Sequence, residues 1–363
     1  MPLSLHSSPV NHRIERFNTV VVGAGQAGLA VARELGERDV DVVVVSDELR
    51  VGDSWRRRWD SLRLFTPARF SGLPGMPFPA PPEHFPDKDE VADYLERYAE
   101  RFDISVRNLS RITSIERHGD FFRLNSKDGI LEASNIVIAT GASHSAHIPA
   151  LAQRITSEIV QLHSSSYKNP WTLPEGPVLV VGAGNSGAQI ALELARTRKV
   201  WLAGRDTGRI PRRVIGRDIF AWVWPVISRA TVDSRIGRAL HSRTQHGGDA
   251  LIGHSRSVFS DAGITRLPRV DGVRSELPVC DGIAVRPRVI IWATGFVPDF
   301  SWIHAPFLRR DGFPIHQRGV VSDVPGLYFV GLKFQHTLSS SLLGGVGADA
   351  TFTAEHIAKE ELR

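Results

Sequence analysis

The chain has 363 residues, 42% hydrophobic and 23% charged, which is typical of a folded protein with room for two domains. The net charge of +5 is scattered, and its densest runs, Arg56-Arg57-Arg58 and Arg212-Arg213, suit anionic small ligands better than nucleic acid. Cys280 is the single cysteine, which excludes an internal disulfide and a Cys-x-x-Cys redox pair. Residues 1–13 lack the apolar core of a signal peptide, and Ile219–Ile227 is too short to span a bilayer. We therefore predict a cytoplasmic protein without stable membrane insertion.

The first informative stretch is an apolar run, Thr19–Val22, that leads through a glycine-rich turn into a helical pattern at Gln26–Arg38. A G-x-G-x-x-G spacing in this strand–turn–helix context predicts a dinucleotide-binding site. The first glycine allows the tight turn, the second lets a pyrophosphate approach, and the third lets the helix pack on the strand. The residues expected to contact this first nucleotide are Gly23, Gly25, Gln26, Ala27 and Gly28.

The same arrangement recurs in the second half of the chain, after the apolar run Pro177–Val181. Each turn is followed by an Ala-Thr-Gly return segment, and Gly141 follows Gly23 by 118 positions while Gly295 follows Gly182 by 113. Two dinucleotides on one chain suggest electron transfer from one to the other. The residues expected to contact the second nucleotide are Gly182, Gly184, Asn185, Ser186 and Gly187.

The residue that binds the ribose lies about 20 positions beyond the glycines in such folds. After the first turn this place falls at the end of the strand Val40–Val45, where Ser46 is followed by Asp47. Either side chain could hydrogen-bond a ribose, and Asp47 could equally be a solvated loop carboxylate.

Ser46 lies 23 positions after Gly23, and the residue 23 positions after Gly182 is Arg205, which follows the predicted strand Lys199–Ala203. A guanidinium at this place suits a 2′-phosphate, because its bidentate contacts match phosphate oxygens. The second nucleotide is therefore predicted to be NADP(H) rather than NAD(H). Arg209, Arg212 and Arg213 could assist.

Between the two turns, periodicity predicts an amphipathic helix at Glu90–Phe102 and an antiparallel insert of three short strands. Trp55 and Trp59, in the long loop 52–75, are four positions apart, so they could share one buried helical face. Residues 207–265 could line a substrate pocket or, the interpretation favoured here, cap the second domain. The predicted insert strands are Ser105–Ile115, Phe121–Leu124 and Ile130–Glu132.

With these segments in view, the chain resembles the class B flavin-dependent monooxygenases, the flavin-containing monooxygenases with their YUCCA-like and bacterial relatives. The resemblance runs from about residue 17 to 358. Ser46 stands where that family usually has a glutamate, and Ser157 and Ile159 replace the Phe and Gly of its linker motif. The segments that carry the resemblance are Gly52–Arg56, Asp60–Leu64, Ser71–Gly75, His163–Tyr167, Ala293–Phe296 and Gly326–Gly331.

The resemblance implies an α/β fold with two Rossmann-like, three-layer (ββα/βαβ) dinucleotide-binding domains in a glutathione-reductase-like arrangement. A flexible tail would occupy residues 1–16. A discontinuous FAD-binding domain would combine residues 17–148 and 286–363, and an NADPH-binding domain would span residues 149–285.

The resemblance also implies further cofactor contacts outside the glycine turns. A helix opened by Gly344–Gly347 would point its N-terminus at the flavin ring. His163 could be an acid–base residue or, more simply, a structural hydrogen-bonding residue between the domains, and Gln335 could contact flavin or lie in an exposed loop. The implied contacts are Trp55, Arg56, Leu64, Thr140, Gly141, Gly331 and Gln335.

The implied activity is a monooxygenase in which NADPH reduces FAD and a C4a-(hydro)peroxyflavin transfers one oxygen atom from O2 to a small organic substrate. The outcome would be N- or S-oxygenation or a Baeyer–Villiger insertion, with no catalytic protein side chain and no metal. Two alternatives stay open: an NADPH-dependent flavin reductase or dehydrogenase without oxygen transfer, and a non-catalytic FAD-binding redox module. The sequence specifies neither the substrate nor the oligomeric state.

Overall fold

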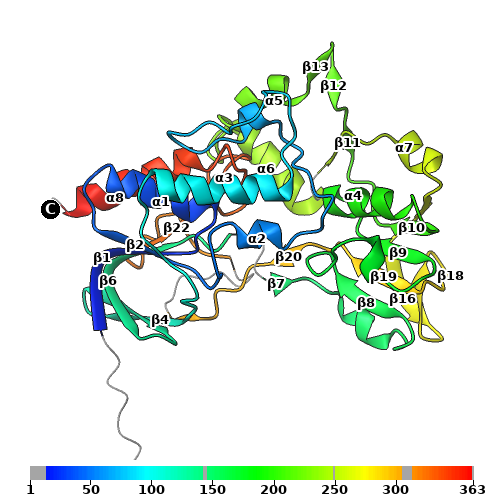
Figure 1. The fold of residues 1–363 in the computed structure, drawn as a ribbon, viewed down its shortest axis with the longest axis horizontal. Coiled ribbons are helices and arrows are strands. Elements are labelled where there is room, and N and C mark those ends of the chain that lie inside the picture. Colours follow the sequence, from blue (N-terminus) through cyan, green and yellow to red (C-terminus); the bar gives the residue numbers. More distant parts are fainter. Residues whose placement is uncertain (1–13, 142–144, 248–249, 305–312, 362–363) are drawn as a thin grey trace, which may run out of the picture.

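The computed structural model describes residues 14–141, 145–247, 250–304 and 313–361. Two lobes lie side by side along the long axis of the molecule, and each lobe is built on its own sheet (Figure 1). The first sheet has the order β21-β4-β5-β6-β1-β2-β3 with β22 paired to β6, and the second has the order β15-β10-β9-β19-β8. The predicted α/β class with two Rossmann-like units is confirmed.

The first sheet is centred on β1 (Ile14–Val22), which runs parallel to β2 (Val42–Val45) on one side and to β6 (Ile130–Ile138) on the other. Val22 is in register with both Val45 and Ile138, so these strands end together beside the first glycine turn. β22 (Leu327–Phe329) adds to the far side of β6, so the chain returns to the first sheet after building the second. A shared carboxyl edge is where such sheets bind ligands.

Alternation along these buried strands gives the first sheet two covered faces. On one face Val21, Val44 and Val137 pack against the helices α1 (Gln26–Gly36), α3 and α8. On the other face Val20, Val43 and Ile136 pack against a meander of β4 and β5 and against residues 300–303 and 321–332. This face is completed by β21, and the remaining bounds are α3 Lys88–Arg101, α8 Gly347–Glu361, β3 Val106–Arg107, β4 Ile112–His118, β5 Phe121–Ser126 and β21 Ile303–His304.

β6 differs from the prediction, which placed a short strand at Ile130–Glu132 ahead of the Ala-Thr-Gly return segment. The structure has one nine-residue strand, because β1 begins at Ile14, inside the predicted tail, and pairs with β6 from Ile130 onward. The buried carboxylate of Glu132 also forms ion pairs with Arg16 at 2.9 Å and with Arg123 at 2.8 Å. These contacts hold the early parts of β1, β5 and β6 together, and the rest of the predicted tail lies outside the described residues.

The second sheet is entirely parallel, with β9 (Val178–Val181) between β10 (Val200–Ala203) and β19 (Val289–Trp292). The helix α4 (Asn185–Leu194) covers one face, and the three-stranded sheet of β16, β17 and β18 covers the other. Part of the linker segment becomes the edge strand β8. The remaining strands are β8 Val160–His163, β15 Thr265–Leu267, β16 Val270–Arg274, β17 Leu277–Cys280 and β18 Ile283–Ala284.

Residues 207–265 cap the second lobe only in part: Leu251, Phe259 and Ile264 pack in its core, as the favoured interpretation expects. Other residues reach the first lobe, where Trp224 stacks on Phe70 at 5.1 Å between ring centroids and Thr231 forms a β-bridge with Thr337. The helices α5 and α6 thus lie over the first lobe, whereas α7 lies beside the second (Figure 1). The elements of this segment are β11 Arg209–Ile210, β12 Arg213–Val214, β13 Arg217–Asp218, α5 Phe220–Ile227, α6 Arg235–Gly247, β14 Leu251–Ile252 and α7 Arg256–Asp261.

The remaining short elements connect the lobes or shape the loops. β7 and β20 pair as a two-stranded ribbon between the lobes (Figure 1). The bounds are α2 Asp53–Arg56, β7 Ser145–Ala146, β20 Phe296–Val297, and the 3-10 turns Ala68–Phe70, Ala150–Arg154 and Pro170–Thr172.

Two tyrosines of α3 fasten the loop that follows the long arginine-rich stretch. The buried Tyr94 hydroxyl accepts from the backbone N–H of Leu73 and donates to the carbonyl of Met76, both at 2.6 Å. The buried Tyr98 hydroxyl donates only to the carbonyl of Pro74, at 2.8 Å. Both rings belong to the core beneath α1.

Tyr94→Phe is expected to lower the free energy of unfolding by about 2 kcal/mol, because it leaves two buried backbone groups without a partner. Tyr98→Phe is the matched control and is expected to cost about 1 kcal/mol, since one carbonyl loses its donor. Urea unfolding followed by tryptophan fluorescence measures both values. Equal losses in the two variants would contradict this account.

Candidate dinucleotide-binding sites

The first glycine turn joins β1 to α1 with no room for side chains at two of its three glycines. Gly23 has φ +110°, and a Cβ there would lie 2.7 Å from the carbonyl oxygen of Ala139. A Cβ on Gly28 would lie 1.8 Å from the carbonyl oxygen of Gly23. At Gly25 a Cβ would meet nothing within 4 Å. The first and third glycines are thus required by packing, and the second leaves an open place above the helix N-terminus.

The second turn repeats this geometry. Gly182 has φ +109°, and a Cβ on it would lie 2.2 Å from the carbonyl oxygen of Ala293. A Cβ on Gly187 would lie 1.9 Å from the carbonyl oxygen of Gly182, whereas one on Gly184 would meet nothing within 4 Å. Neither α1 nor α4 has a side-chain cap at its N-terminus. Uncapped helix N-termini beside an open glycine offer N–H donors and a positive dipole end to a pyrophosphate.

Ser46 directly follows β2, beside the first turn, as predicted. Its side chain is buried, and its Oγ accepts the backbone N–H of Glu48 at 3.2 Å. Asp47 is exposed, and Glu48 forms an ion pair with Arg57. Of the two residues proposed to hold the ribose, Ser46 is the one fixed at the carboxyl edge of the sheet.

The return segment places Thr140 next to the first turn. The Oγ1 atom of Thr140 is buried and has no hydrogen-bond partner among the described residues. Gly141 follows with φ +78°. In the second lobe, the corresponding Thr294 donates its hydroxyl to the carbonyl of His147. An unpaired buried hydroxyl calls for an explanation, and a missing ligand provides one.

Gly331 brings the C-terminal part of the chain against the same turn. Its φ is +88°, and a Cβ there would lie 2.8 Å from the Cβ of Ala27. Gln26 reaches the same C-terminal segment, with Nε2 at 3.4 Å from the carbonyl of Ser341. Gln335 is not in an exposed loop: it is 2% exposed, and its amide donates to the carbonyl of Phe329 at 2.8 Å. Its side chain therefore shapes the loop around Gly331.

The loop between the lobes carries the two tryptophans. Trp55 is half-buried and packs against the cores of both lobes, while Trp59 is buried in the core of the second lobe. The Nε1 atom of Trp59 has no partner among the described residues. Leu64 follows, half-buried, against the first core. The two tryptophans thus do not share one face, because α2 ends after a single turn.

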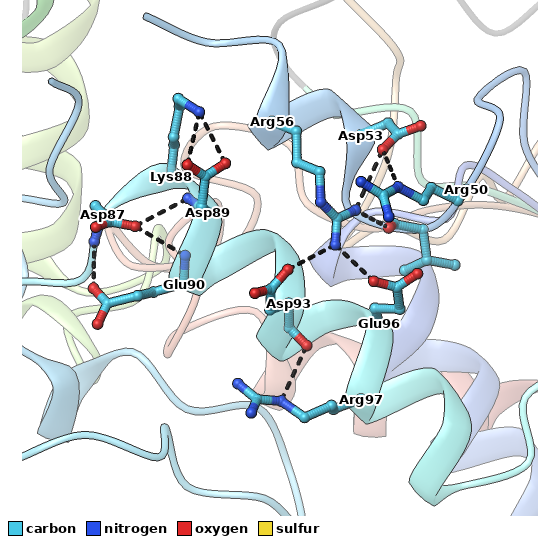
Figure 2. A network of polar contacts seen from close by, with 11 residues as sticks. Arg50, Asp53, Arg56, Asp87, Lys88, Asp89, Glu90, Asp93, Glu96 and Arg97 are labelled. Carbon is cyan, nitrogen blue, oxygen red and sulfur yellow. Dashed lines mark hydrogen bonds and ion pairs between the residues drawn. The ribbon is translucent and has the colours of Figure 1, made fainter. Parts of the chain in front are cut away.

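Arg56 is the centre of a polar network between α2 and α3 (Figure 2). Its guanidinium contacts Glu96 at 2.6 Å, Asp93 at 2.8 Å and Asp53 at 3.3 Å, and donates to the carbonyl of Val51. Although burial works against the charge, the hydrogen bonds to Asp93 and Glu96 raise the pKa of Arg56. The structure ties this guanidinium to carboxylates, so any part it plays in cofactor binding stays a prediction.

A cavity of about 360 Å³ lies at the carboxyl end of β10, where the sequence predicts a 2′-phosphate site. Its wall carries the exposed side chains of Arg205, Arg209 and Arg266 and the half-buried side chain of Thr207. The Oγ1 of Thr207 is buried and without a partner among the described residues. Thr207 was not predicted from the sequence as a site residue, although it lies only two positions after Arg205. Arg266 could not be predicted from the sequence, because the pairing of β10 with the distant strand β15 brings it to the cavity.

Asn185 uses its side chain within the protein. It accepts the N–H of Ile252 at 3.0 Å and donates to the carbonyl of Ala250 at 3.3 Å. Ser186 is exposed at the start of α4.

Arg212 and Arg213 do not join Arg205 and line a different cavity, described below. Arg212 stacks on Phe85, 3.8 Å from the ring centroid, and pairs with Asp218 at 2.7 Å. Of the three arginines proposed to assist Arg205, only Arg209 lies at the same cavity.

His163 lies at the crossing between the lobes. Its Nε2 donates to the carbonyl of Gly295 at 2.9 Å, and its Nδ1 faces the hydroxyl of Ser165 at 2.9 Å. Its ring meets Phe296 edge-on, and Arg58 lies over the same phenylalanine, 5.3 Å from the centroid. Burial, with the nearby Arg58 charge adding to it, lowers the pKa of His163. These contacts favour the structural interpretation.

His163→Gln tests this. The native histidine resists protonation, so below its ordinary pKa of about 6.5 the unfolded chain binds more protons than the folded one. The free energy of unfolding therefore decreases as the pH is lowered. Glutamine keeps a donor for Gly295 but cannot titrate, so the unfolding free energy of the variant should decline less between pH 7 and pH 5.5. Urea unfolding at several pH values measures the slope. Identical slopes in both proteins would show that His163 is not held neutral.

The residues around both turns fit dinucleotides. The open places at Gly25 and Gly184 match the approach of a pyrophosphate, and the unpaired hydroxyls of Thr140 and Thr207 match ligand oxygens or nitrogens. Among the described residues, no group of three or more His, Cys, Asp or Glu side chains could hold a metal ion. Within the same residues, no helix is long and apolar enough to cross a membrane.

Comparison with known proteins agrees with this geometry. The family model for pyridine nucleotide-disulphide oxidoreductases matches residues 20–331. The "Uncharacterized oxidoreductase CzcO-like" of Geobacillus kaustophilus is 39% identical and is aligned over 94% of this chain and 98% of its own. Indole-3-pyruvate monooxygenase YUCCA4 of Oryza sativa is 29% identical and is aligned over 94% of this chain and 87% of its own. The solved flavin-containing monooxygenase of Stenotrophomonas maltophilia is 25% identical over 95% and 99%, with a TM-score of 0.76.

The chain therefore belongs to the pyridine nucleotide-disulphide oxidoreductase family. Within that family it is an oxidoreductase of the flavin-dependent monooxygenase class, of the type that includes the flavin-containing and YUCCA enzymes. The predicted resemblance is confirmed, and proteins of this type use FAD and NADP(H).

Proposed function

We propose that the protein is an FAD-containing, NADPH-dependent monooxygenase that transfers one oxygen atom from O2 to a small organic substrate. The observation that carries the proposal is the pair of matching glycine turns, each with an open second glycine beside an uncapped helix N-terminus. The single cysteine supports it too, because Cys280 is buried and burial raises the pKa of its thiol to about 11. A dithiol mechanism would need a second cysteine and a reactive thiolate.

In this proposal the first turn holds FAD. The N–H groups of Gln26 and Ala27 would bind its pyrophosphate and Ser46 its ribose, and the Thr140 hydroxyl would donate to a polar atom of the cofactor. Bound FAD would accept a hydride from NADPH and then activate O2 for oxygen transfer. The chain's own part is to position both nucleotides and to keep water out, and Trp55 serves the second purpose by packing against both lobes.

The second turn would hold NADPH, with the N–H groups of Asn185 and Ser186 on the pyrophosphate. Arg205 and Thr207 would bind the 2′-phosphate in the cavity at the end of β10. The proposed domain limits follow: residues 17–148 and 286–363 for FAD, and residues 149–285 for NADPH.

Stoichiometry under ¹⁸O2 tests the function. The purified protein, with its flavin identified, is reduced by NADPH without oxygen and then exposed to ¹⁸O2 with amines, thioethers, keto acids and cyclic ketones. We expect at least one product that carries one ¹⁸O atom, with H2O2 well below one per NADPH. Stoichiometric H2O2 with every compound would favour the reductase, and flavin that NADPH cannot reduce would favour the non-catalytic module.

Arg205→Ala tests the choice of nicotinamide cofactor. We expect KM for NADPH to rise about tenfold, because a charge-assisted guanidinium–phosphate contact is lost, while KM for NADH stays within about twofold. Arg274→Ala, an exposed arginine of β16, is the matched control and should change neither value. Steady-state NAD(P)H oxidation measures all four constants. Equal effects of Arg205→Ala on both cofactors would remove Arg205 from the phosphate site.

A further inference from the structure

A second cavity, of about 420 Å³, lies between α4 and the loop that contains Leu64. Its walls come from α4, from residues 61–65 and 83–85, and from residues 212–218 and 252–254 of the segment that crosses between the lobes. We call it the arginine cavity, because Arg63, Arg196, Arg212 and Arg213 all line it. None of the glycine turns contributes to it, and Leu64 is the one predicted cofactor contact among its lining residues.

Beside this cavity, a side-chain amide joins α4 to the loop that contains Leu64. Gln189 of α4 accepts the backbone N–H of Arg63 at 3.4 Å and donates to the carbonyl of the same residue at 3.1 Å. This two-sided contact fixes α4 against the loop, so the walls of the arginine cavity do not depend on a ligand to come together.

The carboxylates that line the cavity are already engaged. Asp218 pairs with Arg212 at 2.7 Å, Glu83 pairs with Arg69 at 2.6 Å, and Glu193 accepts the hydroxyl of Tyr167 at 2.8 Å. Asp218 and Glu83 are thus neutralised by arginines, whereas Glu193 has a neutral hydrogen-bond donor and keeps its charge.

Three of the cavity's guanidinium groups form no ion pair with a carboxylate within the part of the chain that the structure describes, namely those of Arg63, Arg196 and Arg213. All three side chains are exposed. Arg63 donates one Nη1 bond to the carbonyl of Phe85, and its charge also acts on Glu90. The cavity therefore offers an excess of positive charge with fork-shaped donors, which match carboxylate oxygens.

The remaining wall is apolar. Leu64, Phe65, Phe85 and Leu192 line it, and His254 lies beside them with a pKa lowered by burial and by the charge of Arg212. A volume of this size suits a small organic molecule, and apolar walls with a few convergent charges are typical of ligand pockets.

We propose that the arginine cavity binds a small organic carboxylate, with its apolar body against Leu64 and the phenylalanines and its carboxylate among the free guanidinium groups. This site does not depend on the proposed oxygenase reaction, since binding requires neither NADPH nor O2. A ligand placed here would contact Leu64, which is itself among the predicted flavin contacts.

The test uses naphthalene-1-acetate and its uncharged isostere naphthalene-1-acetamide, measured by calorimetry on the purified full-length oxidised protein. We expect the acid to bind at least tenfold more tightly than the amide, and more weakly as salt rises. Arg196→Gln and Arg213→Gln should each weaken binding of the acid about three- to fivefold. Arg274→Gln, outside the cavity, is the control and should leave binding unchanged.

Three results would overturn the proposal. Equal affinities for the acid and the amide would show that the carboxylate is not recognised. Equal effects of the cavity variants and the control variant would show that the acid does not bind in this cavity. Displacement of the acid by saturating NADP⁺ would assign the cavity to the nucleotide. Because the comparison of acid with amide uses the wild-type protein, the outcome does not depend on how any variant folds.

Discussion

The contact on which both lobes depend is the approach of a helix to its own preceding turn. At Gly28 and Gly187 there is no space for even one methyl group, because the carbonyl oxygen of the first glycine occupies it. This approach sets each helix N-terminus directly over the carboxyl edge of its sheet. There the backbone N–H groups of the first helical turn face the open space at the second glycine. Both proposed nucleotide sites are placed by these two edges.

The lobes are joined by residues that serve two structures at once. Trp55 packs in both cores, Gln189 of the second lobe is bonded to the backbone of Arg63 in the first, and His163 meets Phe296 at the crossing strands. The loop that carries Trp55 is in turn fixed to α3 by the carboxylates around Arg56 (Figure 2). Because these contacts lie between the turns, they set how two bound nucleotides would face one another.

Burial explains why the chain depends on positioning rather than on reactive side chains. Its single thiol is buried and held protonated, and burial lowers the pKa of the histidine between the lobes. The guanidinium of Arg56 is neutralised by carboxylates. Reactive chemistry in such a scaffold comes from the cofactor, and the protein supplies orientation and a dry site.

The sequence by itself determined the two nucleotide-binding units. Short-range features encode them: apolar β-branched runs, glycines at fixed spacing, and a helical pattern that follows immediately. It also predicted that Ser46 and Arg205 follow closely after their strands, as they do after β2 and β10, because the apolar runs mark where these strands end.

Only the tertiary structure decided what long-range pairing controls. β6 is extended by its pairing with β1, far away in the sequence, and Arg266 reaches the cavity of Arg205 through the pairing of β10 with β15. The crossing of residues 207–265 onto the first lobe depends on aromatic contacts with Phe70. Such contacts join segments that no local pattern relates, so the side-chain partners of each arginine became known only from the folded chain.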